Sequence, residues 1–344
     1  MMIGQEPIFV LSPPRSGSTL LQRLLGSHSK IFTHPEPHII APLAHLGFYN
    51  QVERAPYDHI NAAKAFREFV EELPNGEEDY LDALRAYANT LYQRVLPSPE
   101  LHFLDKTPEN VRFWPFLLKL FPNARYIVLT RHPAAIMHSV ATSFFGGDYE
   151  AARVGNQVLE RFVPAIGSLM RTSDPRLCLV KYEDLVQNPN SEVERLMVHL
   201  GLNYEESQIE YGKHSHITKS YGDPFGVHQH QKPVTDSKER WVGTVQSDAR
   251  ARAALERSLG GLSDEDLQAY GYPREMLFEP LHRAGDVSSA VIPKGNLSYK
   301  LQRQVFMALK NSAKQRLVYK GLSQIRYVCD VVLRARDQED EQSN

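Results

Sequence analysis

The sequence has few features that would tie the protein to a membrane, an oxidising compartment or a nucleic acid. Its 344 residues include two cysteines, Cys178 and Cys329, which lack the spacing of a metal site and the density of a disulfide framework. No apolar run approaches the ~18 residues that a membrane span requires, and the first residues lack the pattern of a signal peptide. The formal net charge of -2 offers no bulk basic excess for nucleic acid. These absences predict a cytoplasmic, globular protein with no transmembrane span and no nucleic-acid partner.

Fourteen histidines raise the question of a metal site. The close pairs lack the carboxylate and cysteine neighbours that a zinc site usually has. These pairs are His34/His38, His214/His216 and His228/His230. We therefore expect no bound metal.

Short apolar runs, each followed by a helix-like segment, recur along the chain. They cover residues 7–11, 101–105, 125–130 and 177–181. This alternation predicts an α/β fold in which a parallel β-sheet is flanked by helices. Residues 42–97, between the first two runs, have helical periodicity around residues 62–70 and 80–95, and we expect this insert to form helices that cap an acceptor pocket.

The character of the sequence changes after residue 272. Prolines and a glycine mark an irregular connector, and residues 299–336 follow with an apolar stripe and a basic face before an acidic tail. We therefore predict a main domain over residues 1–272 and a C-terminal helical extension over residues 273–344. Its basic helix would pack on the core or on a second subunit, or would dock on an acidic partner or a membrane surface.

The first apolar run leads into a loop of small and polar residues, Ser12 to Thr19, after which leucines continue at helical spacing. A strand, a tight loop and a helix start present free backbone N–H groups and the positive end of a helix dipole to an anion. Gly17 lets the backbone approach the anion closely, and Arg15 adds positive charge. The remaining donors are the hydroxyls of Ser16, Ser18 and Thr19. The loop therefore predicts a phosphate site.

The same loop differs from the nucleotide-triphosphate loop G-x-x-x-x-G-K-[ST]. Gly17 and Thr19 match its last glycine and its hydroxyl, whereas Ser12 replaces the first glycine and Ser18 replaces the lysine. Without that lysine the clamp on the β- and γ-phosphates is missing. A P-loop kinase of a small molecule is therefore the weaker alternative.

The run PPRSGSTLL resembles the 5′-phosphosulfate loop of sulfotransferases that use 3′-phosphoadenosine 5′-phosphosulfate (PAPS). The segment RYIVLTRHPAAIMHS is similar to the family's 3′-phosphate motif, with Arg131 and Ser139 in the phosphate-binding positions. Further segments resemble the family in the same order, namely FLDKTPEN, VKYEDLVQNP and GDPFGVHQHQKPV. The resemblance covers roughly residues 5–272 and implies a P-loop-like sulfotransferase fold.

The resemblance implies that PAPS is the sulfuryl donor and that adenosine 3′,5′-bisphosphate is the product. The residues implied to bind the donor are Pro14, Arg15, Ser16, Gly17, Ser18, Thr19, Arg131, Ser139, Tyr182 and Lys232. Lys106, with Arg15, would stabilise the leaving group.

A glutamate after the first helix faces the acceptor in the branch of tyrosylprotein sulfotransferases and polyketide sulfotransferase domains, and Glu36 matches it. Aryl and steroid sulfotransferases use a histidine just after the second strand, a place where this sequence has none. The sequence is therefore closer to the first branch. Glu36 is the expected general base, with His38 in reserve.

The sequence does not identify the acceptor, which is a small-molecule or carrier-bound hydroxyl. It also leaves open a homo-oligomer and the role of the basic helix. A binding protein that keeps the PAPS site without catalysis is a further alternative, against which the presence of both Glu36 and Lys106 argues.

Overall fold

The computed structural model describes residues 5–49, 59–217, 230–235, 238–283 and 325. The chain divides into two compact units, the first formed by residues 1–41 and 81–291 and the second by residues 42–80 and 292–344. The predicted basic helix over residues 299–336 lies outside the described residues, apart from Ile325. The domain boundary near residue 272 stays a prediction.

Five parallel strands form the sheet of the first unit, in the order β2-β3-β1-β4-β5. They are β1 (Ile8–Leu11), β2 (Ile31–Thr33), β3 (His102–Asp105), β4 (Arg125–Thr130) and β5 (Leu177–Lys181). The predicted α/β class with a parallel sheet flanked by helices is confirmed. Four strands coincide with the four apolar runs, and the three-residue edge strand β2 was not foreseen.

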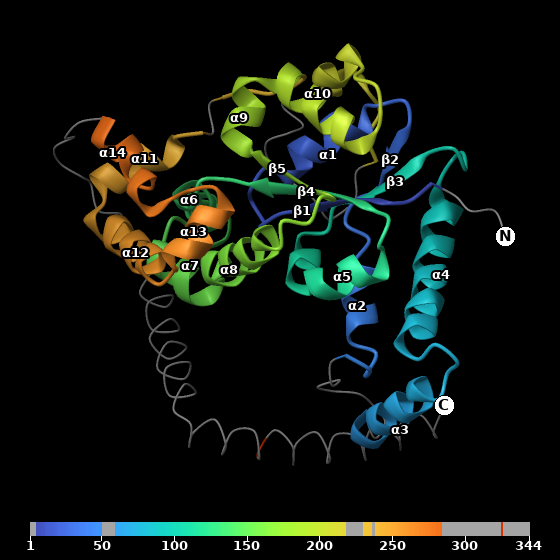
Figure 1. The fold of residues 1–344 in the computed structure, drawn as a ribbon. Helices are drawn as coiled ribbons and strands as arrows, with labels where there is room; N and C mark the ends of the chain where they lie inside the picture. Colours follow the sequence, from blue (N-terminus) through green and yellow to red (C-terminus); the bar gives the residue numbers. More distant parts are fainter. Residues whose placement is uncertain (1–4, 50–58, 218–229, 236–237, 284–324, 326–344) are drawn as a thin grey trace, which may run out of the picture. The chain divides into compact units, whose positions relative to one another are not determined.

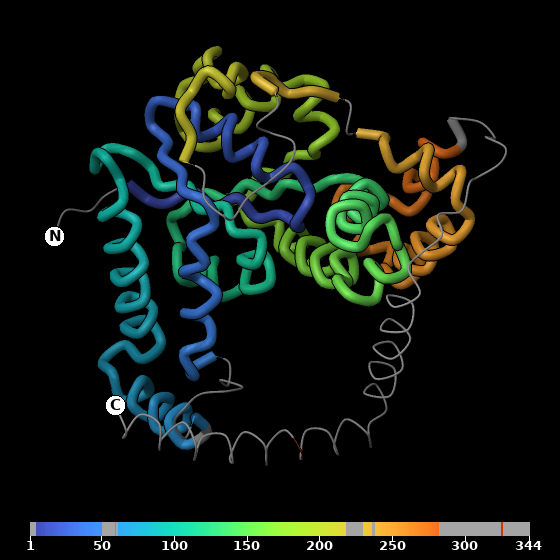
Figure 2. The backbone as a smooth tube through the Cα atoms, turned by 180° about the vertical axis from the view of Figure 1, so that it is seen from behind, coloured from blue at the N-terminus to red at the C-terminus, as the bar shows by residue number. Residues whose placement is uncertain are grey.

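Helices cover both faces of this sheet. On one side lie α1 (Ser18–Gly26), α9 (Tyr182–Gln187) and α10 (Pro189–Leu200), and on the other lie α5 (Trp114–Leu120) and α8 (Val158–Arg171) (Figures 1 and 2). Leucines of α1 and α10 pack against Val10 and Ile127 on the first face. On the second face Phe9 stacks on Tyr126 with ring centroids 5.5 Å apart. Burial on both faces explains why the central strands are almost continuously apolar.

The remaining helices of the first unit follow the strands in sequence. They are the 3-10 helix η1 (Pro108–Phe113), α6 (Pro133–Phe144), α7 (Tyr149–Gly155), η2 (Glu206–Lys213), α11 (Arg240–Ser247), α12 (Ala249–Gly260), α13 (Asp264–Tyr270), η4 (Arg274–Met276) and α14 (Glu279–Arg283). Among the described residues, no helix is long and apolar enough to cross a membrane.

The helices predicted around residues 62–70 and 80–95 of the insert are confirmed. The insert forms α3 (His59–Glu71) and α4 (Glu77–Val95), and it contains the end of α2 (Ile40–Ala44). Within the second unit, Phe66 and Phe48 pack against the ring of Tyr80, with centroids 5.3 and 5.0 Å apart. An aromatic cluster therefore supports the described part of that unit.

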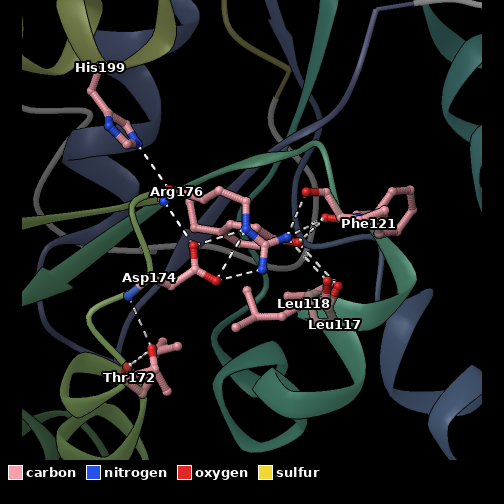
Figure 3. A network of polar contacts seen from close by, with 10 residues as sticks. Leu117, Leu118, Phe121, Thr172, Asp174, Arg176 and His199 are labelled. Carbon is pink, nitrogen blue, oxygen red and sulfur yellow. Dashed lines mark hydrogen bonds and ion pairs between the residues drawn. The ribbon is translucent and has the colours of Figure 1, made fainter.

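An arginine network fixes the amino edge of the sheet. Arg176, just before β5, donates to the backbone carbonyls of Leu118, Phe121 and Pro122 at the end of α5, and it is ion-paired with Asp174 at 2.6 Å (Figure 3). The ring of His199 in α10 lies 3.1 Å from the Arg176 carbonyl oxygen. The network thus ties β5 to helices on both faces, at the opposite end of the strands from the site described next.

Candidate functional site

Most of the side chains singled out in the sequence gather at the carboxyl edge of the sheet, because all five strands run in the same direction. β1 is followed by the loop that begins at Ser12, β3 by Lys106, β4 by Arg131 and β5 by Tyr182. The neighbours of β1 are β3 on one side and β4 on the other. The connection that follows β1 therefore leads to one side of that strand, and the connection from β3 to β4 leads to the other side. Such a switch point at the carboxyl edge is the usual binding place in open α/β sheets.

The loop after β1 has a shape that depends on Gly17. This residue precedes α1 with φ 92°, and a Cβ atom added there would lie 2.3 Å from the ring of Tyr182. The hydroxyl of Ser16 donates to the carbonyl of Pro13 at 2.7 Å, which closes the turn. The structure therefore brings Tyr182 directly against the predicted phosphate loop. Pro14 lies in the turn, and Ser18 and Thr19 open α1.

Two hydroxyls buried beside the loop have no hydrogen-bond partner in the described part of the chain. They are Ser12 Oγ, just after β1, and Thr130 Oγ1, at the end of the adjacent strand β4; both residues are fully buried. Buried polar groups are normally paired, so two such oxygens on neighbouring strands leave hydrogen-bonding capacity for a bound polar group or water.

Arg131 joins the loop to Tyr182. It is largely buried, its Nη1 atom donates to the carbonyl of Arg15 at 3.0 Å, and its guanidinium lies over the Tyr182 ring at 4.4 Å from the centroid. Hydrogen bonding and a cation–π contact hold a permanent positive charge beside the loop.

The side chain of Arg15 reaches toward α6. Its Nε atom donates to Ser139 Oγ at 3.1 Å and its Nη2 atom to Ser143 Oγ at 3.3 Å. Ser139 thereby joins the same group of side chains as the loop. Ser143 was not foreseen, although its position four residues after Ser139 places both hydroxyls on one helix face.

Glu36 and Lys106 form an ion pair with 2.5 Å between Oε1 and Nζ. Lys106 is almost fully buried, and the second carboxylate oxygen of Glu36 lies 3.5 Å from Nε2 of His38. The expected base, the reserve base and the expected leaving-group cation therefore form one cluster. The sequence suggested each of these residues separately. The structure places Glu36 and Lys106, which are 70 residues apart in the chain, in direct contact.

Asp105 is the last residue of β3 and directly precedes Lys106. The carboxylate is fully buried and accepts hydrogen bonds from Tyr92 and Thr107, both at 2.7 Å. Burial raises the pKa of Asp105, whereas these hydrogen bonds and the nearby Lys106 charge oppose the rise. The sequence analysis did not single out this aspartate, even though it stands beside Lys106.

Lys232 lies apart from these contacts in the structure. Its side chain is exposed and ion-paired with Glu210 at 2.7 Å. Most of the loop that precedes it, residues 218–229, lies outside the described residues, so its contact with a phosphate stays a prediction. Within the described ranges, no cluster of three or more His, Cys, Asp or Glu side chains is placed to hold a metal ion.

Comparisons with known proteins agree with the resemblance found in the sequence. Residues 7–206, more than half of the chain, match the family described as "Sulfotransferase family". The chain is 25% identical over 221 residues to protein-tyrosine sulfotransferase 2 of Gallus gallus, covering 58% of each protein. It is 28% identical over 225 residues to nodulation protein NoeE of Sinorhizobium fredii, covering 59% of this chain and 51% of that protein. The chain thus spans little more than half the length of these curated relatives.

Solved structures include similar proteins. One, described as the sulfotransferase domain from the curacin biosynthetic pathway, has a TM-score of 0.49 and 24% identity, covering 78% of this chain and 99% of that domain. Another is described as the sulfotransferase domain from the Synechococcus PCC 7002 olefin synthase. It has a TM-score of 0.49 and 23% identity, covering 76% of this chain and 97% of that domain. The match over residues 7–206, together with the relatives above, shows that this chain belongs to the sulfotransferase family.

Proposed function

We propose that the protein transfers a sulfuryl group from PAPS to a hydroxyl of an acceptor by in-line displacement. The observation that carries this proposal is the convergence, at one edge of one sheet, of the predicted phosphate loop, a buried arginine, and an ion pair between a buried lysine and a partly buried glutamate. Family membership supports the reaction class.

The donor would use two anion sites of this edge. The backbone N–H groups of the loop and the first turn of α1 would hold the 5′-phosphosulfate, because a helix start favours negative charge. Arg131 and Ser139 would hold the 3′-phosphate, with Tyr182 beneath Arg131 and Lys232 as a further contact. The free oxygens of Ser12 and Thr130 and the close approach at Gly17 fit a ligand rich in polar atoms.

In the chemical step, the acceptor oxygen forms a bond to sulfur while the bond from sulfur to the bridging phosphate oxygen breaks. Glu36 takes the proton of the acceptor hydroxyl, and adenosine 3′,5′-bisphosphate leaves. Lys106 and Arg15 stabilise the negative charge that develops on the leaving oxygen. Lys106 contacts Glu36 at 2.5 Å, so the base and this cation belong to one group of side chains around the reacting sulfuryl group. His38 is the alternative base.

We propose that the reaction needs no metal ion. The leaving adenosine 3′,5′-bisphosphate is already stable without magnesium, and the fixed cations Arg15 and Lys106 would supply the charge that magnesium supplies in phosphoryl transfer. The acceptor, a small-molecule or carrier-bound hydroxyl, stays a prediction. So do the selection of the acceptor by residues 42–97 and the docking role of the C-terminal extension. A homo-oligomer and a cytoplasmic location are likewise predictions.

Substitution Arg131→Ala tests the donor site. We expect the affinity for adenosine 3′,5′-bisphosphate to fall roughly 10–100-fold, because a charge-assisted contact is worth about 1.5–3 kcal/mol. The affinity for adenosine 5′-phosphosulfate, which lacks the 3′-phosphate, should change little. Isothermal titration in EDTA measures both. Arg125→Ala, at the exposed start of the same strand, is the matched control. Equal losses for the two ligands would refute this assignment of Arg131.

A further inference from the structure

The segment Tyr270-Gly271-Tyr272, at the end of α13, holds the backbone on which Arg131 stands. The hydroxyl of Tyr270 accepts a hydrogen bond from the Arg131 N–H at 3.3 Å and donates one to the Arg131 carbonyl at 3.1 Å. The two residues are 139 positions apart in the chain, and Tyr270 lies beyond the part that matches the family, residues 7–206.

Tyr270 is suited to hold this backbone in one place. Its side chain is fully buried, and burial raises the pKa of Tyr270, so the hydroxyl keeps the proton that it donates. Arg131 follows the last residue of β4, so the ladder of that strand ends before it. Without the Tyr270 hydroxyl, a buried N–H and a buried carbonyl would each lose a partner, which is costly in an apolar interior.

A second connection fixes the next residue. The hydroxyl of Tyr272 donates to one carboxylate oxygen of Glu183, and the other oxygen accepts from the His132 N–H at 3.1 Å. The His132 ring stacks on Trp241 with centroids 4.8 Å apart. Two consecutive residues, Arg131 and His132, are therefore held by two tyrosines, one directly and one through Glu183.

The position of these tyrosines depends on close packing of α13. Gly271 ends the helix with φ 93°, a conformation that other residues rarely adopt, and this turn places Tyr270 and Tyr272 with ring centroids 5.8 Å apart. A Cβ atom added to Gly167 in α8 would lie 2.9 Å from the backbone of Asp266, so the two helices approach very closely. The tyrosines thus belong to a tightly packed element.

We propose that Tyr270 is a positioning residue for the donor nucleotide, which sets the place of the Arg131 guanidinium and thereby the selectivity for a 3′-phosphate. The proposal rests on the function proposed above, in which Arg131 receives that phosphate. The guanidinium has to bridge the loop carbonyl of Arg15 and the Tyr182 ring, so a displaced backbone at Arg131 would disturb both contacts.

The test is the substitution Tyr270→Phe, which removes the hydroxyl and keeps the ring. The selectivity ratio, the affinity for adenosine 3′,5′-bisphosphate divided by that for adenosine 5′-phosphosulfate, should fall about tenfold by isothermal titration. Tyr272→Phe, which releases Glu183, should lower the same ratio to a smaller extent, and it provides a second variant if Tyr270→Phe does not fold.

Tyr126→Phe is the matched control. Tyr126 lies in the same strand, β4, and its buried hydroxyl also bonds two backbone carbonyls, those of Leu117 and Phe121, but far from the loop. We expect it to lower the unfolding midpoint and to leave the ratio unchanged. If Tyr270→Phe lowers stability but keeps the wild-type ratio while Arg131→Ala loses it, the positioning role is wrong and the proposed function stands. If the wild type does not bind adenosine 3′,5′-bisphosphate, the proposed function itself fails.

Discussion

Replacement of Glu36 by glutamine is expected to slow sulfuryl transfer by about 10²–10⁴-fold, the range that general-base catalysis usually contributes. Glutamine keeps an oxygen that can accept from Lys106, so the buried lysine retains a partner and the site keeps its shape. What it loses is the ability to take the acceptor proton. The rate is measured as release of adenosine 3′,5′-bisphosphate with a hydroxyl acceptor found by screening.

The same variant should bind adenosine 3′,5′-bisphosphate as tightly as the wild type, because Glu36 makes no proposed contact with the nucleotide. His38→Gln serves as the comparison, since His38 lies 3.5 Å from the Glu36 carboxylate. A large loss of rate in His38→Gln with nearly normal rate in Glu36→Gln would transfer the role of base to His38.

Replacement of Gly17 by alanine is expected to weaken nucleotide binding by more than tenfold and to lower the unfolding midpoint. The added Cβ would fall 2.3 and 2.5 Å from two atoms of the Tyr182 ring, at a φ of 92°. Either Tyr182 moves away from Arg131 or the loop changes shape, and both changes disturb the donor site. Isothermal titration and thermal unfolding measure the two effects.

Gly201→Ala separates the effect of backbone strain from the effect of the collision with Tyr182. Gly201 ends α10 with φ 72°, and nothing lies within 4 Å of a Cβ atom placed there, so this change adds backbone strain without a collision. Strain of this kind costs roughly 1–2 kcal/mol of stability, and nucleotide binding should remain normal. Wild-type nucleotide affinity in Gly17→Ala would show that the contact between the loop and Tyr182 is dispensable.

Much of the fold followed from the sequence because its main signals are local. The four apolar runs became strands, and in the three central ones, β1, β3 and β4, both faces are buried and little polar alternation survives. β2 was not predicted, because it has three residues at the sheet edge and only one of them is buried. The phosphate loop was found because strand, glycine and helix start are contiguous in the chain.

The contacts that complete the site could not be found in this way, because they join residues far apart. Arg15 meets Ser143 across 128 residues, and Tyr270 meets Arg131 across 139. Glu36 and Lys106 were both proposed, yet their ion pair depends on the pairing of β2 with β3, which local periodicity does not reveal. Asp105 ends an apolar strand, and its place in the site depends on hydrogen bonds from Tyr92 and Thr107, which the sequence pattern does not reveal.

The most direct test of the central claim is which nucleotide the wild-type protein binds, and whether binding needs magnesium. Isothermal titration would compare adenosine 3′,5′-bisphosphate and ATP, each with magnesium and with EDTA. We expect micromolar binding of the bisphosphate that is equal in both buffers, and no comparable binding of ATP. Binding of ATP that depends on magnesium, with none of the bisphosphate, would contradict the account and would make the loop from Ser12 to Thr19 a kinase site.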